Sequence, residues 1–146
     1  MGDQEVEILL VEDNETDLEL TLRALRKVHL ANKVLAVRDG AEALDYLFAT
    51  GEFTGRNSAA HPRVVLLDLK LPKVDGIEVL RRIRSDARTA RVPVVVLTSS
   101  AEESDRIATY ELGVNSFIVK PVEFDSFSRA VTEIGMYWML LNRTAD

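Results

Sequence analysis

The sequence predicts a doubly wound α/β domain, in which a five-stranded parallel sheet lies between two layers of helices. Two observations carry this prediction. Five short apolar runs rich in β-branched residues recur along the 146-residue chain, and the stretches between them have apolar residues at helical spacing. The runs are continuously apolar rather than alternating, which is typical of parallel strands that are covered on both faces. Right-handed crossovers then place helices on both sides of the sheet.

The five apolar runs are the expected strands. In chain order they are residues 6–11, 34–37, 64–67, 94–97 and 117–119. Each run is three to six residues long, which is in the range of strands in small domains. The third run, VVLL, is followed at once by Asp68. A lone carboxylate inside such a strand is costly to desolvate, so we expect it at the open end of the strand or beside a charged partner.

The helices are expected in the connections, where apolar residues repeat every three or four positions. The first four stripes are Leu18, Leu22 and Leu25; Leu44 and Leu47; Ile77, Leu80 and Ile83; and Ile107 and Leu112. Capping signals agree with them. Asn14 or Thr16 can cap the first helix, Asp75 opens the third, and Ser100 with Glu103 has capping-box spacing for the fourth.

Two segments depart from a minimal alternation of strand and helix. Residues 51–62, GEFTGRNSAAHP, are polar and too long for a short connection, so we expect a surface insertion there. The fifth helix starts at about Phe124 and is extended. Its sheet-facing stripe is Phe127, Val131, Ile134, Trp138 and Leu141. Met136, Met139 and Leu140 point away from that stripe, and such apolar surface predicts a homodimer through this helix.

Composition limits the classes of function. The chain is 47% apolar and 29% charged, which predicts one globular domain over residues 1–146. A formal charge of −6 without a basic stripe argues against nucleic acid and anionic membranes as partners. There is no cysteine, hence no disulfide, thiolate metal site or thiol nucleophile. The acidic N-terminus resembles no export signal, so we expect a cytoplasmic protein.

Polar side chains follow four of the five expected strands. Glu12 and Asp13 end the first, Asp68 the third, Thr98 the fourth, and Lys120 the fifth. In a doubly wound sheet, ligands bind beyond the carboxyl ends of the strands. Taken singly, each residue is more often a helix cap or a solvated loop residue. Their joint placement predicts one site, where Asp68 is an acceptor that opens to solvent.

Three clustered carboxylates repel one another unless a divalent cation or a lysine offsets their charge. Oxygen ligands suit Mg²⁺ or Mn²⁺ rather than zinc or copper, and a magnesium ion that keeps several waters favours phosphate as a further ligand. The pattern therefore indicates phosphoryl chemistry. Asp68 can act as the nucleophile, Lys120 can neutralise the transferred oxygens, and Thr98 can donate a hydrogen bond to one of them.

These residues resemble the receiver domains of two-component response regulators. The segments LLVEDN, LLDLKLPKVDG, VVVLTSS and SFIVKP match that family in type, order and spacing, and the resemblance runs from about residue 7 to 141. It implies the flavodoxin-like receiver fold, with strand order 2-1-3-4-5 and five flanking helices. It also implies a phosphoacceptor that signals through the face of its fourth helix, fifth strand and fifth helix, rather than an enzyme.

The resemblance assigns a role to each site residue. Asp68 is implied to be phosphorylated, and Glu12, Asp13 and Asp68 to hold the metal together with the backbone carbonyl of Lys70. Thr98 is the implied switch hydroxyl and Lys120 the implied phosphoryl contact. Two further residues follow. Phe117 is implied to be the aromatic that turns inward on activation, and the Lys120–Pro121 peptide bond to be cis.

A narrower resemblance is to the small stand-alone regulators associated with bacterial phytochromes, because of the 51–62 insertion and the run EIGMYWMLLN. It implies a phytochrome-type sensor histidine kinase as the partner. Glu12 stands where many relatives have aspartate, so we expect its longer side chain to reach the metal through water. The same acceptor chemistry is compatible with a phosphorelay carrier.

Sequence features argue against three other classes of function. A phosphatase of the haloacid dehalogenase type would usually have a second aspartate two residues after its nucleophile, where this chain has Lys70. A flavin-binding module would need a phosphate-wrapping loop, which is absent from the sequence. A GTPase would need GxxxxGK[ST] after the first strand, and VEDNETD stands there instead.

Overall fold

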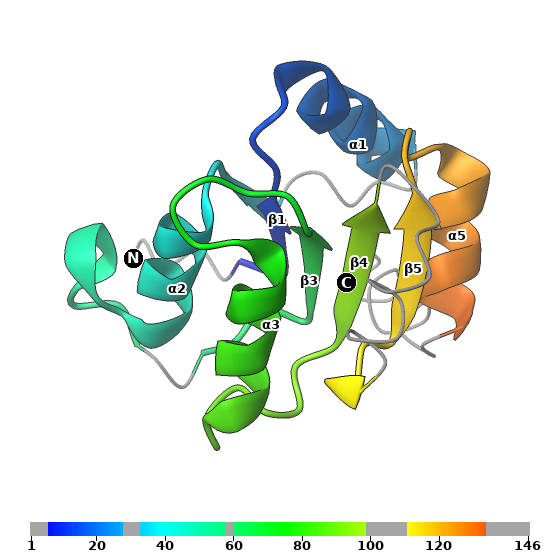
Figure 1. Cartoon of the computed structure of the whole chain (residues 1–146). Coiled ribbons are helices and arrows are strands. Elements are labelled where there is room, and N and C mark those ends of the chain that lie inside the picture. The colour runs from blue at the N-terminus through cyan, green and yellow to red at the C-terminus, as the bar shows by residue number, and fades with distance from the viewer. Residues whose placement is uncertain (1–5, 28–32, 58–59, 99–110, 134–146) are drawn as a thin grey trace, which may run out of the picture.

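A five-stranded parallel sheet forms the centre of the computed structural model, which describes residues 6–27, 33–57, 60–98 and 111–133. The strand order is β2-β1-β3-β4-β5, as the resemblance to receiver domains implies (Figure 1). The strands are β1 (Ile8–Val11), β2 (Val34–Val37), β3 (Val64–Asp68), β4 (Val94–Thr98) and β5 (Ser116–Val119). The third and fourth strands each run one residue further than their apolar cores, so Asp68 and Thr98 are themselves strand residues.

Helices cover both faces of this sheet (Figure 1). They are α1 (Glu15–Lys27), α2 (Gly40–Phe48), α3 (Gly76–Ser85) and α5 (Phe124–Glu133). The helix expected between β4 and β5, with its Ser100 and Glu103 signal, lies outside the described residues. So do Met136, Met139 and Leu140 of the expected dimer surface.

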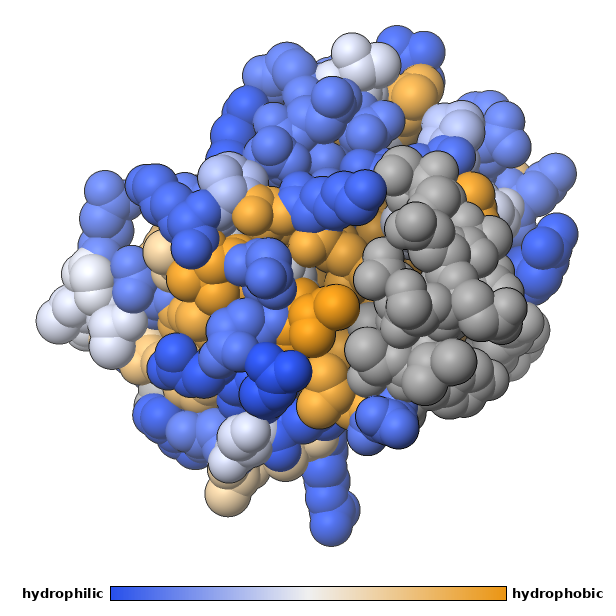
Figure 2. Space-filling view, in the orientation of Figure 1, coloured by the Kyte–Doolittle hydropathy of each residue, from blue (hydrophilic) through white to orange (hydrophobic). Residues whose placement is uncertain are grey.

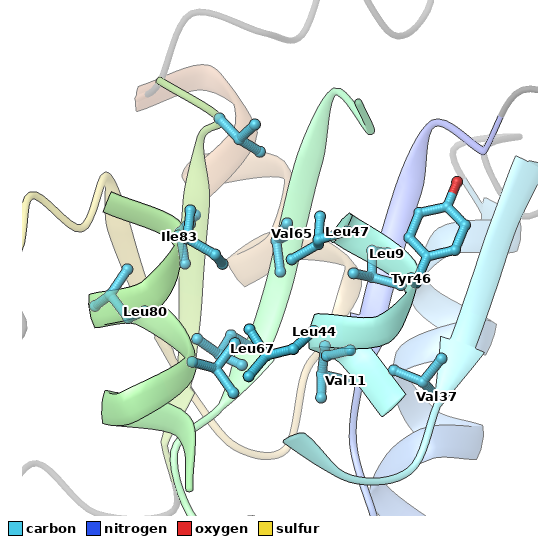
Figure 3. Close-up of a cluster of buried hydrophobic side chains, with 14 of the residues drawn as sticks. Leu9, Val11, Val37, Leu44, Tyr46, Leu47, Val65, Leu67, Leu80 and Ile83 are labelled. Atoms are coloured by element: carbon cyan, nitrogen blue, oxygen red, sulfur yellow. The ribbon is translucent and has the colours of Figure 1, made fainter. Parts of the chain in front are cut away.

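Alternate strand residues feed two separate cores. On one face, Leu66 of β3 packs in a cluster with residues of α1 and α5. On the other face, Leu67 packs with Leu44 and Leu47 of α2 and Leu80 of α3 (Figure 3). Both faces of the sheet are thus buried, which is why its strands are continuously apolar. Burial of this apolar surface is the main stabilising contribution to the fold.

The helix starts are fixed as the sequence predicts. Asn14 Oδ1 accepts a hydrogen bond from the Asp17 N–H at 2.8 Å, which caps α1. Asp75 Oδ1 accepts from the Glu78 N–H at 3.0 Å, which caps α3. Gly76 follows the cap, and a Cβ there would lie 2.4 Å from the Asp68 carbonyl oxygen. The glycine therefore lets α3 start directly against the end of β3.

The expected surface insertion is tied closely to α2. Gly51–Phe53 forms a short 3₁₀ helix, η2. Phe53 meets Tyr46 edge to face, with ring centroids 5.2 Å apart. The Arg56 guanidinium lies 4.0 Å from the Tyr46 ring centre and donates to the Tyr46 carbonyl oxygen at 2.8 Å. Phe53 therefore packs against its own domain.

Polar side chains cover most of the visible surface, and apolar ones gather near the middle of the face that carries α3 (Figure 2). Among the described residues, the large apolar side chains with the highest exposure are Val119 and Phe124, at 46% and 37%. No helix in the described part of the chain has the length and apolar character needed to cross a bilayer.

Candidate phosphoacceptor site

The site lies at the carboxyl ends of three strands, the central β1 and β3 and the edge strand β5. Asp68 is the last residue of β3, Glu12 directly follows β1, and Lys120 directly follows β5. Asp68 continues the row of β3 side chains, Val64 and Leu66, that faces α1 and α5. Parallel strands place their carboxyl ends at one edge, and the register pairs Val11 with Leu67 across that edge.

Lys120 lies at the centre of the site. Its Nζ donates to Glu12 Oε1 at 3.1 Å, to Asp68 Oδ2 at 3.1 Å and to Asp17 Oδ2 at 3.0 Å. The Lys120 side chain is 9% exposed and that of Asp68 6%. Asp68 lies at the end of its strand and has a charged partner, so both of these expectations are confirmed. The expectation that it opens to solvent there is wrong, because the residue is 4% exposed.

Burial and mutual repulsion change the pKa values here. Burial raises the pKa of the Glu12 carboxyl to about 7, and the adjacent Asp68 carboxylate adds to the rise. Burial lowers the pKa of Lys120, but hydrogen bonds to Asp17, Asp68 and Glu12 outweigh this effect and hold it above its ordinary value. The ammonium is therefore protonated at neutral pH, and its hydrogen bond to Glu12 offsets part of the rise in the pKa of that carboxyl.

The acidic residues also suit a hard cation. Carboxylate oxygens of Glu12, Asp13 and Asp68 lie within 4.8 Å of one another. Asp13 is exposed while the other two are buried, so one side of this cluster is open to solvent. Of these three carboxylates, Lys120 contacts only Glu12 and Asp68. A divalent cation with oxygen ligands would offset the negative charge that remains. The residues present fit Mg²⁺ or Mn²⁺.

Backbone groups hold the two buried carboxylates in place. The Lys70 N–H donates to Asp68 Oδ1 at 3.2 Å, and the Asn14 N–H donates to Glu12 Oε2 at 3.1 Å. Both oxygens of Asp68 thus have a donor, because Oδ2 accepts from Lys120. The Lys120–Pro121 peptide bond is cis, as the resemblance implies.

The implied switch residues lie next to the site. Thr98, 7% exposed, is the last residue of β4, and it pairs with Val119. Phe117 of β5 pairs with Val96 and is half-buried against the cluster of α2 and α3. Since Val96 and Thr98 are two residues apart on one strand, Thr98 and Phe117 project toward the same face.

Asp17 is the site residue that sequence reasoning missed. It lies in the first turn of α1, and its contact with Lys120 joins positions 103 apart in the sequence. A signal was present: Asp17, Thr21 and Ala24 follow helical spacing, and the latter two are buried. Asp17 therefore lies in line with a buried row of α1. The apolar stripe of Leu18, Leu22 and Leu25, on which the sequence prediction relied, is the next row around the helix.

Two relatives of known class are similar to this chain over most of their length. The chain is 45% identical over 137 residues to the "Probable methanogenesis regulatory protein FilR2" of Methanothrix harundinacea, covering 94% of this chain and 86% of the relative. It is 39% identical over 132 residues to the response regulator Rcp1 of Synechocystis, covering 90% and 88%.

Solved structures of similar proteins have the same fold. The bacteriophytochrome response regulator AtBRR is 58% identical, with a TM-score of 0.81 over 90% of this chain and 93% of that one. RtBRR, also a bacteriophytochrome response regulator, is 56% identical, with a TM-score of 0.83 over 90% and 78%. The Mn²⁺-bound form of Rcp1 is 37% identical, with a TM-score of 0.73 over 92% and 93%.

These likenesses favour none of the phosphatase, flavin-binding or GTPase alternatives. The family model that matches residues 8–132 is that of the response regulator receiver domain. The match spans all five strands and includes every residue of the site described above. The chain belongs to the response regulator receiver domain family.

Proposed function

We propose that this chain is a single-domain response regulator, residues 1–146, whose Asp68 accepts a phosphoryl group from the phosphohistidine of a sensor histidine kinase. The observation that carries the proposal is the pairing of Asp68 with Lys120. A carboxylate buried at the end of a central strand, with an ammonium 3.1 Å away and two acidic neighbours, is expensive to maintain. Buried, closely paired ionisable groups of this kind cluster at the active sites of proteins.

The proposed step is an in-line displacement at phosphorus. An Asp68 carboxylate oxygen attacks, a P–O bond forms, and the P–N bond to the kinase histidine breaks. The electron pair of that bond leaves with the imidazole nitrogen, which takes up a proton. In this step Lys120, whose Nζ lies 3.1 Å from Asp68 Oδ2, would neutralise the phosphoryl oxygens, and the Thr98 hydroxyl, at the end of the adjacent strand, would donate to another of them.

Glu12, Asp13 and Asp68 would hold the divalent cation, with the Lys70 backbone carbonyl as the further proposed ligand. When bound, Mg²⁺ or Mn²⁺ supplies positive charge that offsets the phosphoryl oxygens. The Mn²⁺-bound form of Rcp1 and a Pseudomonas aeruginosa receiver domain with magnesium in its active site cleft support this choice of cation. The chain's activity is proposed to be limited to phosphotransfer to itself and loss of that group.

The test is phosphorylation with acetyl phosphate and Mg²⁺, followed by intact mass. We expect the wild type to gain one acid-labile phosphoryl group and Asp68→Asn to gain none. Asp125→Asn, which removes an exposed aspartate in α5, is the control and should behave as wild type. Chelation of the metal should abolish transfer in the wild type and in Asp125→Asn. A phosphoryl group on Asp68→Asn would overturn the assignment of the acceptor.

A phytochrome-type histidine kinase is the proposed partner. The support is the likeness to the bacteriophytochrome response regulators AtBRR and RtBRR, and to the response regulator Rcp1. Transfer from a panel of purified, radiolabelled kinases tests the pairing. Rapid labelling by a phytochrome-type kinase over the others is expected, and equal labelling by all would contradict it. A histidine phosphotransfer domain added afterwards would reveal onward transfer, the mark of a relay carrier.

We also propose a cytoplasmic location and a homodimer through the final helix, with Met136, Met139 and Leu140 at its surface. The support for the dimer is the sequence alone, in which these residues leave the sheet-facing stripe. Light scattering over a concentration series should detect the dimer in the wild type but not in a Met136→Glu, Leu140→Glu double variant. A wild type that is monomeric at high micromolar concentration, with and without phosphodonor, would contradict this proposal.

A further inference from the structure

Asp17 contacts the phosphoryl-binding lysine from outside the expected metal cluster. Its carboxylate extends from the first turn of α1 to Lys120 Nζ, at 3.0 Å, and its side chain is 27% exposed. The cluster that can hold a cation comprises Glu12, Asp13 and Asp68, and it does not include Asp17. Asp17 is thus a partner of Lys120 that would neither bind the metal nor carry the phosphoryl group.

Helix capping does not account for this side chain. In a capping box, the acidic residue at the third helical position accepts from the N–H of the capping residue. Here that N–H, on Asn14, donates to Glu12 Oε2 at 3.1 Å instead. The Asp17 backbone N–H is capped by Asn14 Oδ1, so the carboxylate itself is left to bind Lys120. Glu15 in the same turn forms an exposed ion pair with Arg38, away from the site.

The donors of Lys120 are fully used. An ammonium has three N–H groups, and here each has a carboxylate to serve: Glu12, Asp17 and Asp68. Binding of a cation by Glu12 and Asp68 draws those two carboxylates toward the metal. If they were the only partners of Lys120, ammonium and cation would compete for the same oxygens. A third carboxylate on a different element gives Lys120 a partner that the cation cluster does not include.

We propose that Asp17 is a positioning residue for Lys120, because it fixes one N–H of the ammonium toward α1. When Asp68 is phosphorylated, the other two N–H groups can then turn from the Glu12 and Asp68 carboxylates to the phosphoryl oxygens. The inference rests on the proposed phosphorylation of Asp68. Without the Asp17 anion, Lys120 is drawn onto Glu12 and Asp68, which opposes the cation, and it loses the anchor that aims it at the phosphoryl group.

Two measurements test this role in Asp17→Asn, which keeps the size of the side chain and removes its charge. In the unphosphorylated protein, the dissociation constant of Mg²⁺, followed by backbone amide shifts, should rise about 5-fold. With Mg²⁺ saturating, the maximal rate of phosphorylation by acetyl phosphate should fall about 10-fold, while the concentration of acetyl phosphate at half-maximal rate stays unchanged.

A third measurement observes the lysine directly. The ¹⁵N-detected ammonium signal of Lys120 should be visible in the wild type, where three hydrogen bonds slow its proton exchange. It should be lost or strongly broadened in Asp17→Asn. Asp17→Glu restores the carboxylate and should recover the ammonium signal and part of the rate. A purely structural role for Asp17 would move the thermal midpoint but leave the ammonium signal and the affinity for Mg²⁺ unchanged.

Glu19→Gln is the matched control. Glu19 lies on the same helix, its side chain is 55% exposed and pairs with Arg26, and its removal changes the net charge equally. Equal effects of Glu19→Gln and Asp17→Asn would reduce the result to net charge and overturn the inference. So would a wild-type affinity for Mg²⁺ and a wild-type rate in Asp17→Asn. If Asp17→Asn fails to fold, Asp17→Glu decides: values unlike wild type in every readout would contradict the proposal.

The outcome for Asp17 is separable from the proposed function. If the wild type takes up no phosphoryl group from acetyl phosphate or from any kinase, the function assigned to Asp68 fails. The ammonium signal and the affinity for Mg²⁺ still report whether Asp17 positions Lys120.

Discussion

Glu12 and Asp68 are tolerated as buried carboxylates because one ammonium serves both. Lys120 contacts each of them at 3.1 Å, and backbone N–H groups of Asn14 and Lys70 occupy a further oxygen on each side chain. Buried charges are stable only when they are paired and hydrogen-bonded in this way. The remaining negative charge is a stability cost, which the fold carries because it creates affinity for a cation.

Lys120→Met tests this balance. Because it leaves buried carboxylates without their cation, it should lower the free energy of unfolding by about 3 kcal/mol in the absence of metal. Added Mg²⁺ should raise the thermal midpoint of the variant more than that of the wild type, since the ion replaces the missing charge. Calorimetry with and without Mg²⁺ measures both effects.

Lys73→Met provides the comparison, because the Lys73 side chain is 70% exposed and forms an ion pair with Asp39, outside the site. Its loss should have little effect on stability. Equal stability of Lys120→Met and wild type in chelator would show that the ammonium does not stabilise the carboxylates.

The residues of the site differ in how far the sequence predicts them. Glu12, Asp68 and Lys120 follow apolar runs, so counting to the end of each strand is enough to bring them together. Asp17 belongs to a helix, and a helix can rotate about its axis until packing fixes it. The burial of the α1 face that includes Thr21 and Ala24 sets this rotation, and it depends on packing against the sheet.

At the scale of elements, the insertion is held by one guanidinium. Arg56 donates to the Tyr46 and Leu47 carbonyl oxygens at the end of α2, and to those of Asn57 and Ala60 within the insertion. It therefore supplies donors to carbonyls in the last turn of the helix, where backbone N–H partners are few. Its stacking on Tyr46 adds a cation–π contact.

Arg56→Ala should lower the free energy of unfolding by about 2 kcal/mol, because hydrogen bonds to a charged group and the stacking on Tyr46 are lost together. Urea denaturation measures this loss. Arg56→Lys keeps the charge but cannot form the fork of hydrogen bonds, so it should recover only a minor part. Full recovery by lysine would mean that charge, rather than the planar fork, holds the insertion.

The end of α3 has a pH-dependent contribution. Hydrogen bonds from the Arg88 side chain and backbone lower the pKa of Asp86 to about 2, from 3.8. A carboxyl with a depressed folded pKa stabilises the fold above its unfolded pKa and loses that contribution as pH falls toward its folded pKa. The contribution is therefore complete above about pH 4 and decreases between 3.8 and 2.

Asp86→Asn should accordingly be less stable than the wild type at pH 5, and the difference should shrink at pH 3. Urea midpoints at the two pH values measure it. Asp125→Asn, whose exposed carboxyl is in the first turn of α5, corrects for the general effect of removing an acid. A difference between Asp86→Asn and wild type that is constant from pH 5 to pH 3 would contradict the assigned ion pair.

The elements themselves were predictable where local rules and burial agree. Continuous apolar runs gave the sheet because both of its faces are covered, and Asn14 and Asp75 gave helix starts because their side chains accept from the backbone. The insertion was predictable only as polar and long. Its actual packing depends on Arg56 reaching carbonyls up to ten positions back, which no periodic pattern encodes.

At the scale of the whole molecule, the site connects the two faces of the sheet. Asp68 and its partners lie on the side of α1 and α5, whereas Phe117 packs on the side of α2 and α3. Thr98 ends β4, which pairs with both β3 and β5, and it projects toward the same face as Phe117. A change at Asp68 can therefore reach the opposite face through a single strand end.

Thr98→Ala tests this connection. We predict that phosphorylation draws the Thr98 hydroxyl toward Asp68 and that the vacated space admits the Phe117 ring, a population shift between two packings. The variant should accept the phosphoryl group in the wild-type amount, yet the amide shifts of β5 and α5 that accompany phosphorylation should be absent. Thr98→Ser retains the hydroxyl and should restore at least part of them. If Thr98→Ala shows the same β5 and α5 shifts as the wild type, the signal leaves Asp68 by another route, of which the nearest is Lys120 and α1.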